Sequence, residues 1–177
     1  MLVTLVVAIV AASIAVARGG SLKSLAETRF AWVPLLIAAL VLQVMADLLW
    51  AGGTPVIALT FVAVALFLFL NRHLPGMLIA AFGMTLNLIV IGLNGAMPVS
   101  LWAADVAGIE ITPQDTGVKH EIADENTALA PLGDTIPLPR TGRILSPGDL
   151  IIAAGIGILV YRRTLSAAPV EAKTASG

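Results

Sequence analysis

The chain has 177 residues, of which 58% are hydrophobic and only 12% are charged. Soluble domains carry about 25% charged residues, so this composition argues against a soluble domain and indicates a membrane protein. The formal net charge is −1, and without a basic face to neutralise phosphates nucleic acid is excluded as a partner. Cysteine is absent and the two histidines, His73 and His120, lie far apart, so we expect neither a metal site nor a cofactor.

The first apolar stretch, residues 1–17, has no positive charge in front of it, and Arg18 follows it. This is the reverse of a cleavable signal, so we expect a retained first span with its N-terminus outside. Crossing the roughly 30 Å of bilayer hydrocarbon takes about 20 helical residues. Stretches that meet or approach this length lie at about 1–17, 32–51, 55–71, 76–94 and 148–161. The sequence therefore predicts an all-α integral membrane protein with five transmembrane helices, of which the first and last are short.

The basic residues predict the orientation of these spans. Five alternating spans place one group of them on a single face: Arg18, Lys23, Arg29, Arg72, Arg162, Arg163 and Lys173. By the positive-inside rule that face is cytoplasmic, which gives an N-out, C-in protein of the bacterial cytoplasmic membrane. The segment 95–147 then falls outside, and it is rich in acids: Asp105, Glu110, Asp115, Glu121, Asp124, Glu125 and Asp134.

The predicted organisation has four parts. Residues 1–94 form a four-span membrane bundle, 95–147 an external segment, 148–163 the fifth transmembrane helix and 164–177 a disordered cytoplasmic tail. Within the external segment, "SLWAADVAGIEI" predicts a short helix or strand at the membrane surface, with Trp102 at the headgroup level. The fold of residues 99–145 is otherwise not predicted.

Two polar residues interrupt the second span. Gln43 and Asp47 are four residues apart and so share one helix face. They are candidates for facing a ligand, a proton or a cation, because ionisable groups in a bilayer need a partner or a purpose. The alternative is structural: Asp47 lies one turn inside Trp50, where a carboxylate reaches interfacial water.

Two asparagines, Asn87 and Asn94, share a face of the fourth span. They are further candidates for facing a ligand, and an asparagine here can also hydrogen-bond to a neighbouring helix. Asn94-Gly95 is in addition typical of a helix C-terminus, because Pro98 prevents continuation of the helix. These two roles are compatible.

The stretch "SPGD" matches a helix capping box, with Ser146 as the N-cap and Asp149 at the third helical position. This explains Asp149 without any catalysis. Asp134, in "LGDTIPLP", is predicted to form a turn or to pair with Arg140 or Arg143. His120 is predicted to be a solvated loop residue.

Four motifs together carry a resemblance: "NRHLPG", "NLIVIGLNGAMPVS", "LGDTIPLP" and "SPGDLIIAAG". They resemble, in that order, the signature segments of the uncharacterised bacterial integral membrane family catalogued as domain-of-unknown-function family 5317. The resemblance covers about residues 1–162. It implies a bacterial inner-membrane protein and implies no activity.

A second, weaker similarity is to signal peptidase II, the lipoprotein signal peptidase, a four-span aspartyl protease. "LSPGDLII" begins the last span as a catalytic segment does in that family, with Asp149 in the matching place. The family's other catalytic aspartate follows G-N-x-x at the outer end of its third span, whereas "GLNGAMPVS" here contains no acid. A dyad would therefore have to use Asp134 or Asp105, held a few ångströms from Asp149.

Three functions follow as hypotheses. The first is a non-enzymatic accessory or assembly protein whose external segment contacts a protein partner. The second is a membrane-embedded aspartyl hydrolase that uses Asp149. The third is a small carrier or lipid-binding protein, dimeric if a larger cavity is needed, with a groove lined by Gln43, Asp47, Asn87 and Asn94. We expect the first.

Overall fold

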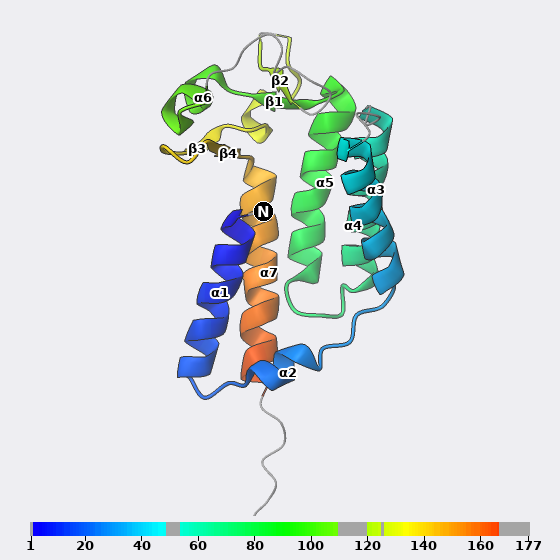
Figure 1. The fold of residues 1–177 in the computed structure, drawn as a ribbon, viewed down its shortest axis with the longest axis vertical. Coiled ribbons are helices and arrows are strands. Elements are labelled where there is room, and N and C mark those ends of the chain that lie inside the picture. Colours follow the sequence, from blue (N-terminus) through cyan, green and yellow to red (C-terminus); the bar gives the residue numbers. More distant parts are fainter. Residues whose placement is uncertain (1, 49–53, 110–119, 125, 167–177) are drawn as a thin grey trace, which may run out of the picture.

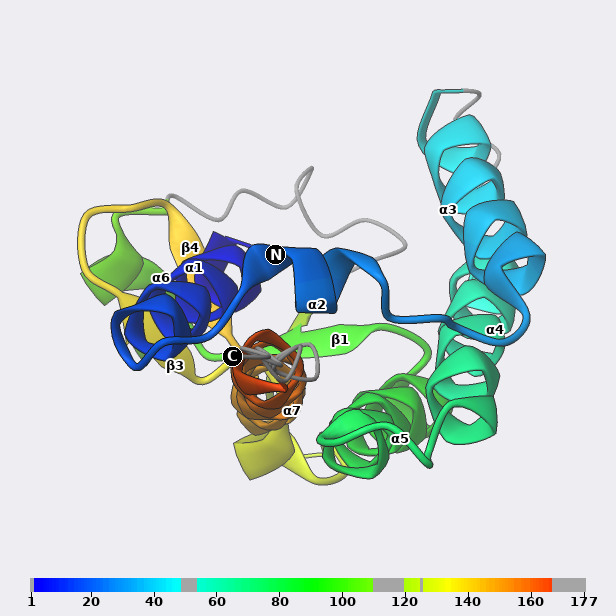
Figure 2. The same ribbon diagram turned by 90° about the horizontal axis from the view of Figure 1, so that it is seen from below.

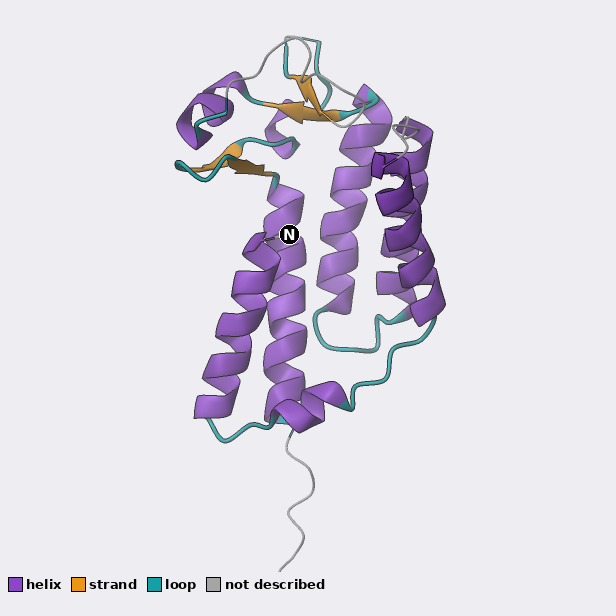
Figure 3. Ribbon diagram, viewed as in Figure 1, coloured by secondary structure: helices purple, strands orange, loops and turns teal. Residues whose placement is uncertain are grey.

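The computed structural model describes residues 2–48, 54–109, 120–124 and 126–166, which are mostly helical (Figures 1 and 3). The helices are α1 (Leu2–Ala17), α2 (Leu22–Ala26), α3 (Val33–Leu48), α4 (Thr54–Leu70), α5 (Met77–Asn94), α6 (Leu101–Ala107) and α7 (Pro147–Leu165), with a 3-10 turn η1 (Ala130–Leu132). These described residues also form four short strands: β1 (Met97–Val99), β2 (His120–Ile122), β3 (Ile136–Leu138) and β4 (Arg143–Leu145).

The helical class is confirmed, and a long helix lies over each of the five predicted apolar stretches. Among the described residues, α5 is the one helix whose length and composition suffice to cross a membrane. Shorter apolar helices lie at Leu2–Ala17, Val33–Ala46 and Pro55–Leu70. The last helix, α7, has 19 residues and carries Asp149 in its first turn and Arg162 and Arg163 in its last.

The five long helices form a single curved row. In the row, α1 packs on α7, α7 on α5, α5 on α4 and α4 on α3, and Figure 2 shows the row end-on as an open arc. The last helix of the chain is therefore inserted between the first helix and α5. Gly20 and Ser21, which follow α1, meet the C-terminal end of α7 at Thr164, so α1 and α7 run in the same direction.

Glycines bring α5 and α7 into backbone contact. A Cβ built on Gly83 would lie 2.6 Å from the carbonyl oxygen of Gly148, and one on Gly155 would lie 2.6 Å from the amide nitrogen of Ala80. Gly76 faces the backbone of Gly155 more closely still and has a positive φ of 79°. Small residues at an interface let helix backbones approach, so these glycines fix where the two helices cross.

The core between α4 and α5 is apolar and lies toward the α2 end of the bundle. Its buried residues are Phe67, Leu68, Leu74, Met77, Ala80, Ala81 and Leu159. The segment before α3 joins this core through Phe30, whose ring centroid lies 6.2 Å from that of Phe67. This contact holds the α2–α3 connection against the end of α4.

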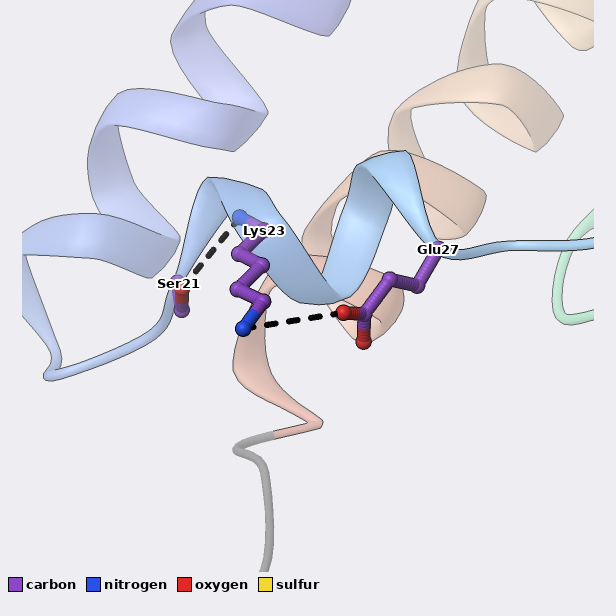
Figure 4. Close-up of polar contacts among 3 residues, drawn as sticks. All are labelled: Ser21, Lys23 and Glu27. Atoms are coloured by element: carbon purple, nitrogen blue, oxygen red, sulfur yellow. Dashed lines mark hydrogen bonds and ion pairs between the residues drawn. The ribbon is translucent and has the colours of Figure 1, made fainter.

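The short helix α2 was not predicted from the sequence. The Ser21 side chain caps it by accepting a hydrogen bond of 3.2 Å from the amide of Lys23, and the Lys23 ammonium lies 3.9 Å from the Glu27 carboxylate (Figure 4). The Ser21 amide donates to the carbonyl of Thr164 over 2.7 Å. The chain between α1 and α3 is thereby attached to the end of α7.

The opposite end of the bundle carries a folded segment, which we call the cap, made of the described residues between α5 and α7 (Figures 1 and 3). Strand β1 pairs in parallel with β2, and on its other side Val99 forms a parallel bridge with Asp134. Helix α6 begins at Ser100, which caps it, and packs on the antiparallel hairpin β3–β4. The amide of Gly142, in the hairpin turn, donates to the carbonyl of Ala107 over 3.0 Å. Of the two predicted alternatives for "SLWAADVAGIEI", the helix is therefore correct over residues 101–107.

Candidate functional site

The junction of α5, α7 and the cap contains a closed ring of hydrogen bonds among three polar side chains. The Asn87 amide Nδ2 donates to Asp149 Oδ1 over 3.0 Å, and Ser146 Oγ donates to Asn87 Oδ1 over 2.9 Å. The ring closes through the start of α7, where the Asp149 amide donates to Ser146 Oγ over 3.0 Å. The Ser146 amide donates to Asp149 Oδ2 over 3.3 Å. The predicted capping box at Ser146 and Asp149 is therefore confirmed.

The ring is largely closed to its surroundings. Asn87 is 2% exposed and Ser146 is fully buried, while Asp149 is half-buried. A Cβ built on Gly148 would overlap Asn87 Oδ1, so only glycine leaves room for the amide at this position. A buried polar group is costly unless it has a partner, and here each side chain satisfies the next. The ring therefore fastens the start of α7 to the middle of α5.

Asn94 makes a second fastening, at the end of α5. Its side-chain Nδ2 donates to the carbonyl of Ala128 over 2.9 Å, and its Oδ1 accepts from the amide of Ala128 over 2.8 Å. The same Nδ2 donates to the Val90 carbonyl over 2.8 Å. Gly95 follows in the left-handed conformation with φ 81°, which confirms the predicted helix end. Asn94 thus ends a helix and holds a loop of the cap at the same time.

Asn71, at the end of α4, repeats this arrangement at the other end of the bundle. Its Oδ1 accepts from the Ala31 amide over 2.7 Å, and its Nδ2 donates to the Ala31 carbonyl over 2.9 Å and to the Phe67 carbonyl over 2.8 Å. The side chain is fully buried. No role was predicted for Asn71 from the sequence. Its position at the end of an apolar helix, equivalent to that of Asn94, is the signal that could have identified it.

The other two residues predicted to face a ligand, Gln43 and Asp47, lie on α3. Gln43 Oε1 accepts a hydrogen bond from Thr60 Oγ1 over 3.0 Å and so links α3 to α4. Asp47 lies within α3, but its side chain is outside the described residues. Of the candidates for facing a ligand, Asn87 is brought together with Asp149, while Gln43 and Asn94 bind to Thr60 and Ala128 respectively.

The acids proposed as dyad partners of Asp149 differ in environment. Asp134 is buried at 8% exposure, and its backbone donates to Pro98 over 2.8 Å and accepts from Ser100 over 3.0 Å, which adds an edge to β1. Asp105 is exposed on α6. The side chain of His120 lies outside the described residues. Among the residues that are described, no group of three or more His, Asp or Glu side chains is placed to hold a metal ion.

One family model, described as a family of unknown function (DUF5317), matches residues 24–161. The chain belongs to this family. The matched region begins within α2 and ends four residues before the end of α7, so it contains the ring, both asparagine fastenings and the whole cap. Three of the four motifs that suggested the family lie where α5, α7 and the cap meet, and the fourth, "NRHLPG", contains Asn71 at the other end of the bundle.

No curated protein and no solved structure matches the chain. The similarity of the last span to signal peptidase II therefore has no support beyond the sequence and stays a prediction. In this DUF5317 protein, Asp149 is engaged through both carboxylate oxygens. Each of these bonds occupies one acceptor site of the carboxylate.

Proposed function

We propose that this DUF5317 protein crosses the bacterial cytoplasmic membrane five times, through α1, α3, α4, α5 and α7, with its N-terminus outside. Two observations support this topology. The helices of the row expose large apolar side chains, among them Leu48 at 69% and Leu93 at 60%. Arg18 and Arg72 lie in turns, and Lys23 lies in α2, all at the end of the bundle that the positive-inside rule assigns to the cytoplasm.

The lengths of the helices are compatible with five crossings. They have 16 to 19 residues. At 1.5 Å per residue these helices are roughly 24–29 Å long, slightly less than the hydrocarbon thickness of about 30 Å. Where a helix is a few ångströms shorter than the hydrocarbon layer, the bilayer thins locally. This thinning costs fractions of a kcal/mol per ångström of mismatch.

Within this topology, we propose a non-enzymatic accessory role in which the cap is presented outside the membrane to a protein partner. One observation carries the proposal: the polar side chains at the junction are engaged in building the cap. The ring of Asn87, Ser146 and Asp149 anchors the end of the cap, and Asn94 anchors its loop at Ala128. A segment anchored at several points is suited to presenting a fixed surface.

The surface that best fits a partner is the exposed side of α6. Leu101 is 56% exposed and Trp102 is 65% exposed, whereas Ala103, Ala104 and Ala107 are buried against the cap. Tryptophan is enriched at the centres of protein interfaces, where its large side chain contributes much of the binding energy. The alternative is that Trp102 lies at the headgroup level of the bilayer. In that case its replacement would not release a protein partner.

The test is co-purification from native membranes of the full chain with Leu101→Ser and Trp102→Ser combined. The proposal predicts a stoichiometric protein partner with the wild-type chain that is lost with the double variant. A matched control is Phe82→Ser, which removes a 59% exposed apolar side chain from α5, away from the cap, and should retain the partner. Wild-type co-purification by the double variant would contradict the proposal.

The hydrolase alternative is distinguished by Asp149→Asn. Asparagine at this position preserves an acceptor for the Ser146 amide and removes the charge that a protease dyad requires. The accessory role predicts that the variant retains the partner and rescues a deletion strain. A stable Asp149→Asn protein that binds the partner and fails to rescue would favour the hydrolase.

A further inference from the structure

A groove of about 490 Å³ runs between α1 and α7, along the part of α7 that lies beyond the ring of Asn87, Ser146 and Asp149. Its walls include Val6, Val10 and Ile14 of α1, which are 49%, 51% and 47% exposed. On the α7 side it is lined by Ala154 and Gly157. The lining is almost entirely apolar over most of its length, so it suits a hydrocarbon chain and not a polar solute.

The two helices that flank the groove are in contact with each other. A Cβ built on Gly157 would lie 2.7 Å from Val7 Cγ1, so the small residue at 157 lets α1 approach α7. Beside this contact, Ala154 is exposed and leaves the groove unfilled. A larger residue at 154 would occupy the space without entering the contact between the helices.

One end of the groove is cationic. The Arg18 guanidinium, through Nη1, donates to the Tyr161 hydroxyl over 2.7 Å, and both side chains line the groove. A guanidinium has five N–H donors, so this bond leaves most of them available. Among the described residues, no carboxylate forms an ion pair with Arg18. An anion at the mouth of the groove would find a charged donor held in place by the tyrosine.

The dimensions match one leaflet of a bilayer. Between Val6 and Arg18 the groove follows the last 12 residues of α1, which is about 18 Å of helix, against about 15 Å for half of the hydrocarbon core. In the proposed orientation Arg18 lies at the cytoplasmic surface, where the anionic lipids of the inner leaflet attract basic side chains. We infer that this groove binds one anionic phospholipid of the inner leaflet, with an acyl chain along α1 and α7 and the phosphate at Arg18 and Tyr161. The inference rests on the proposed topology but not on the proposed partner.

The probes are dioleoyl-phosphatidylglycerol and dioleoyl-phosphatidylcholine, added to the delipidated full chain in detergent. Native mass spectrometry measures the fraction of protein that retains one lipid. Two variants change residues that line the groove: Arg18→Gln removes the charge, and Ala154→Phe fills the apolar part. Two matched controls lie elsewhere: Arg72→Gln removes an exposed arginine that packs over Phe69, and Ala38→Phe enlarges an exposed alanine of α3.

We expect one phosphatidylglycerol to be retained in preference to phosphatidylcholine. Arg18→Gln should weaken retention about fivefold, the loss typical of one basic residue at a membrane surface, and Ala154→Phe should abolish the preference. The two controls should behave as the wild type. Retention by Arg18→Gln and Ala154→Phe equal to that of the controls, or equal retention of both lipids by the wild type, would overturn the inference.

The result of the lipid-binding test does not depend on the proposed role of the cap. Circular dichroism of each variant shows whether the helices persist, and Tyr161→Phe provides a milder change that removes only the hydroxyl that positions Arg18. Labelling of Ser21→Cys, three residues after Arg18, reports the side of the membrane on which this end of α1 lies. If that cysteine is labelled from outside, the topology has failed. If it is labelled only from the cytosol and the groove variants bind lipid normally, the groove inference alone has failed.

Discussion

The side-chain amide of Asn87 donates a hydrogen bond of 3.0 Å to the carboxylate of Asp149, which lies 62 residues further along the chain. This single contact links the middle of α5 to the first turn of α7. Ser146, the N-cap residue of α7, also forms hydrogen bonds with both residues. Sequence-distant residues are thus held in one unit, and most tests of the structure follow from it.

Replacing Asn87 by alanine should destabilise the protein more than loss of an ordinary interhelical hydrogen bond does. In membrane proteins such bonds average about 0.6 kcal/mol. Here the change leaves the Ser146 hydroxyl without its acceptor and Asp149 Oδ1 without its donor, and a buried group left unpaired costs about 1–3 kcal/mol. We expect a loss in the latter range, measured as the free energy of unfolding in detergent.

The control for this variant is Thr85→Ala. The Thr85 hydroxyl donates to the carbonyl of Ala81 in its own helix over 2.8 Å, and the residue is exposed. Surface changes of this kind usually stay within about 0.5 kcal/mol. Equal losses in the two variants would show that the ring contributes nothing beyond a local bond.

Two glycine-to-alanine changes should have opposite effects. At Gly148 the added methyl group would overlap Asn87 Oδ1, so the change should destabilise by about 1–3 kcal/mol through overpacking. At Gly92, on the exposed side of α5, a Cβ would meet nothing within 4 Å. Alanine there should stabilise by about 0.5–1 kcal/mol because it favours the helix. Thermal unfolding of the two variants beside the wild type tests this; a stable Gly148→Ala protein would contradict the close crossing.

The two asparagine fastenings should act at opposite ends of the bundle. Asn94→Ala should increase hydrogen exchange at the amide of Ala128, whereas Asn71→Ala should increase it at the amide of Ala31, because each amide loses its acceptor. Each variant serves as the control for the other. Faster exchange at both amides in either variant would indicate general loosening instead of a local role.

The turn at Asp124 should respond to pH in a defined direction. Hydrogen bonds from the Thr127 hydroxyl and the Asn126 amide lower the pKa of the Asp124 carboxyl below its ordinary value. Because the folded pKa is depressed, the turn is stabilised above the ordinary aspartate pKa, and this stabilisation is lost as the pH falls through the folded value. Thr127→Val should raise the pKa of Asp124, measured by NMR titration of its carboxyl carbon. An unchanged titration would contradict the hydrogen bond.

The long helices were predictable because each carries a local signal. Ser146 and Asp149 mark the start of α7, and Asn94 with Gly95 marks the end of α5. These signals act within one helical turn, so the order of residues is enough to find them. The expected roles of Ser146 as a cap and of Asn94 as a helix end are confirmed for that reason.

The pairing of elements was not predictable. Strands β1 and β2 have three residues each and are more than 20 residues apart in the chain. Such short strands show no periodic pattern that would predict their parallel pairing. Helix α1 is apolar on all sides, so its sequence does not reveal that it packs on α7. The partners of Asn87 and Asn94 lie 59, 62 and 34 residues away. Such contacts depend on the tertiary fold, and local patterns in a single sequence do not predict them.

The proposed topology puts the cap outside the membrane, on five helices of which the first begins outside and the last ends in the cytoplasm. Because the chain contains no cysteine, single cysteines can be placed at will. The most direct measurement is labelling of Thr141→Cys, in the hairpin of the cap, and of His73→Cys, between α4 and α5, by a membrane-impermeant thiol reagent. We predict that intact cells label position 141 alone and that position 73 reacts only after permeabilisation. Labelling of position 73 in intact cells, or recovery of the chain in the soluble fraction without detergent, would contradict the claim.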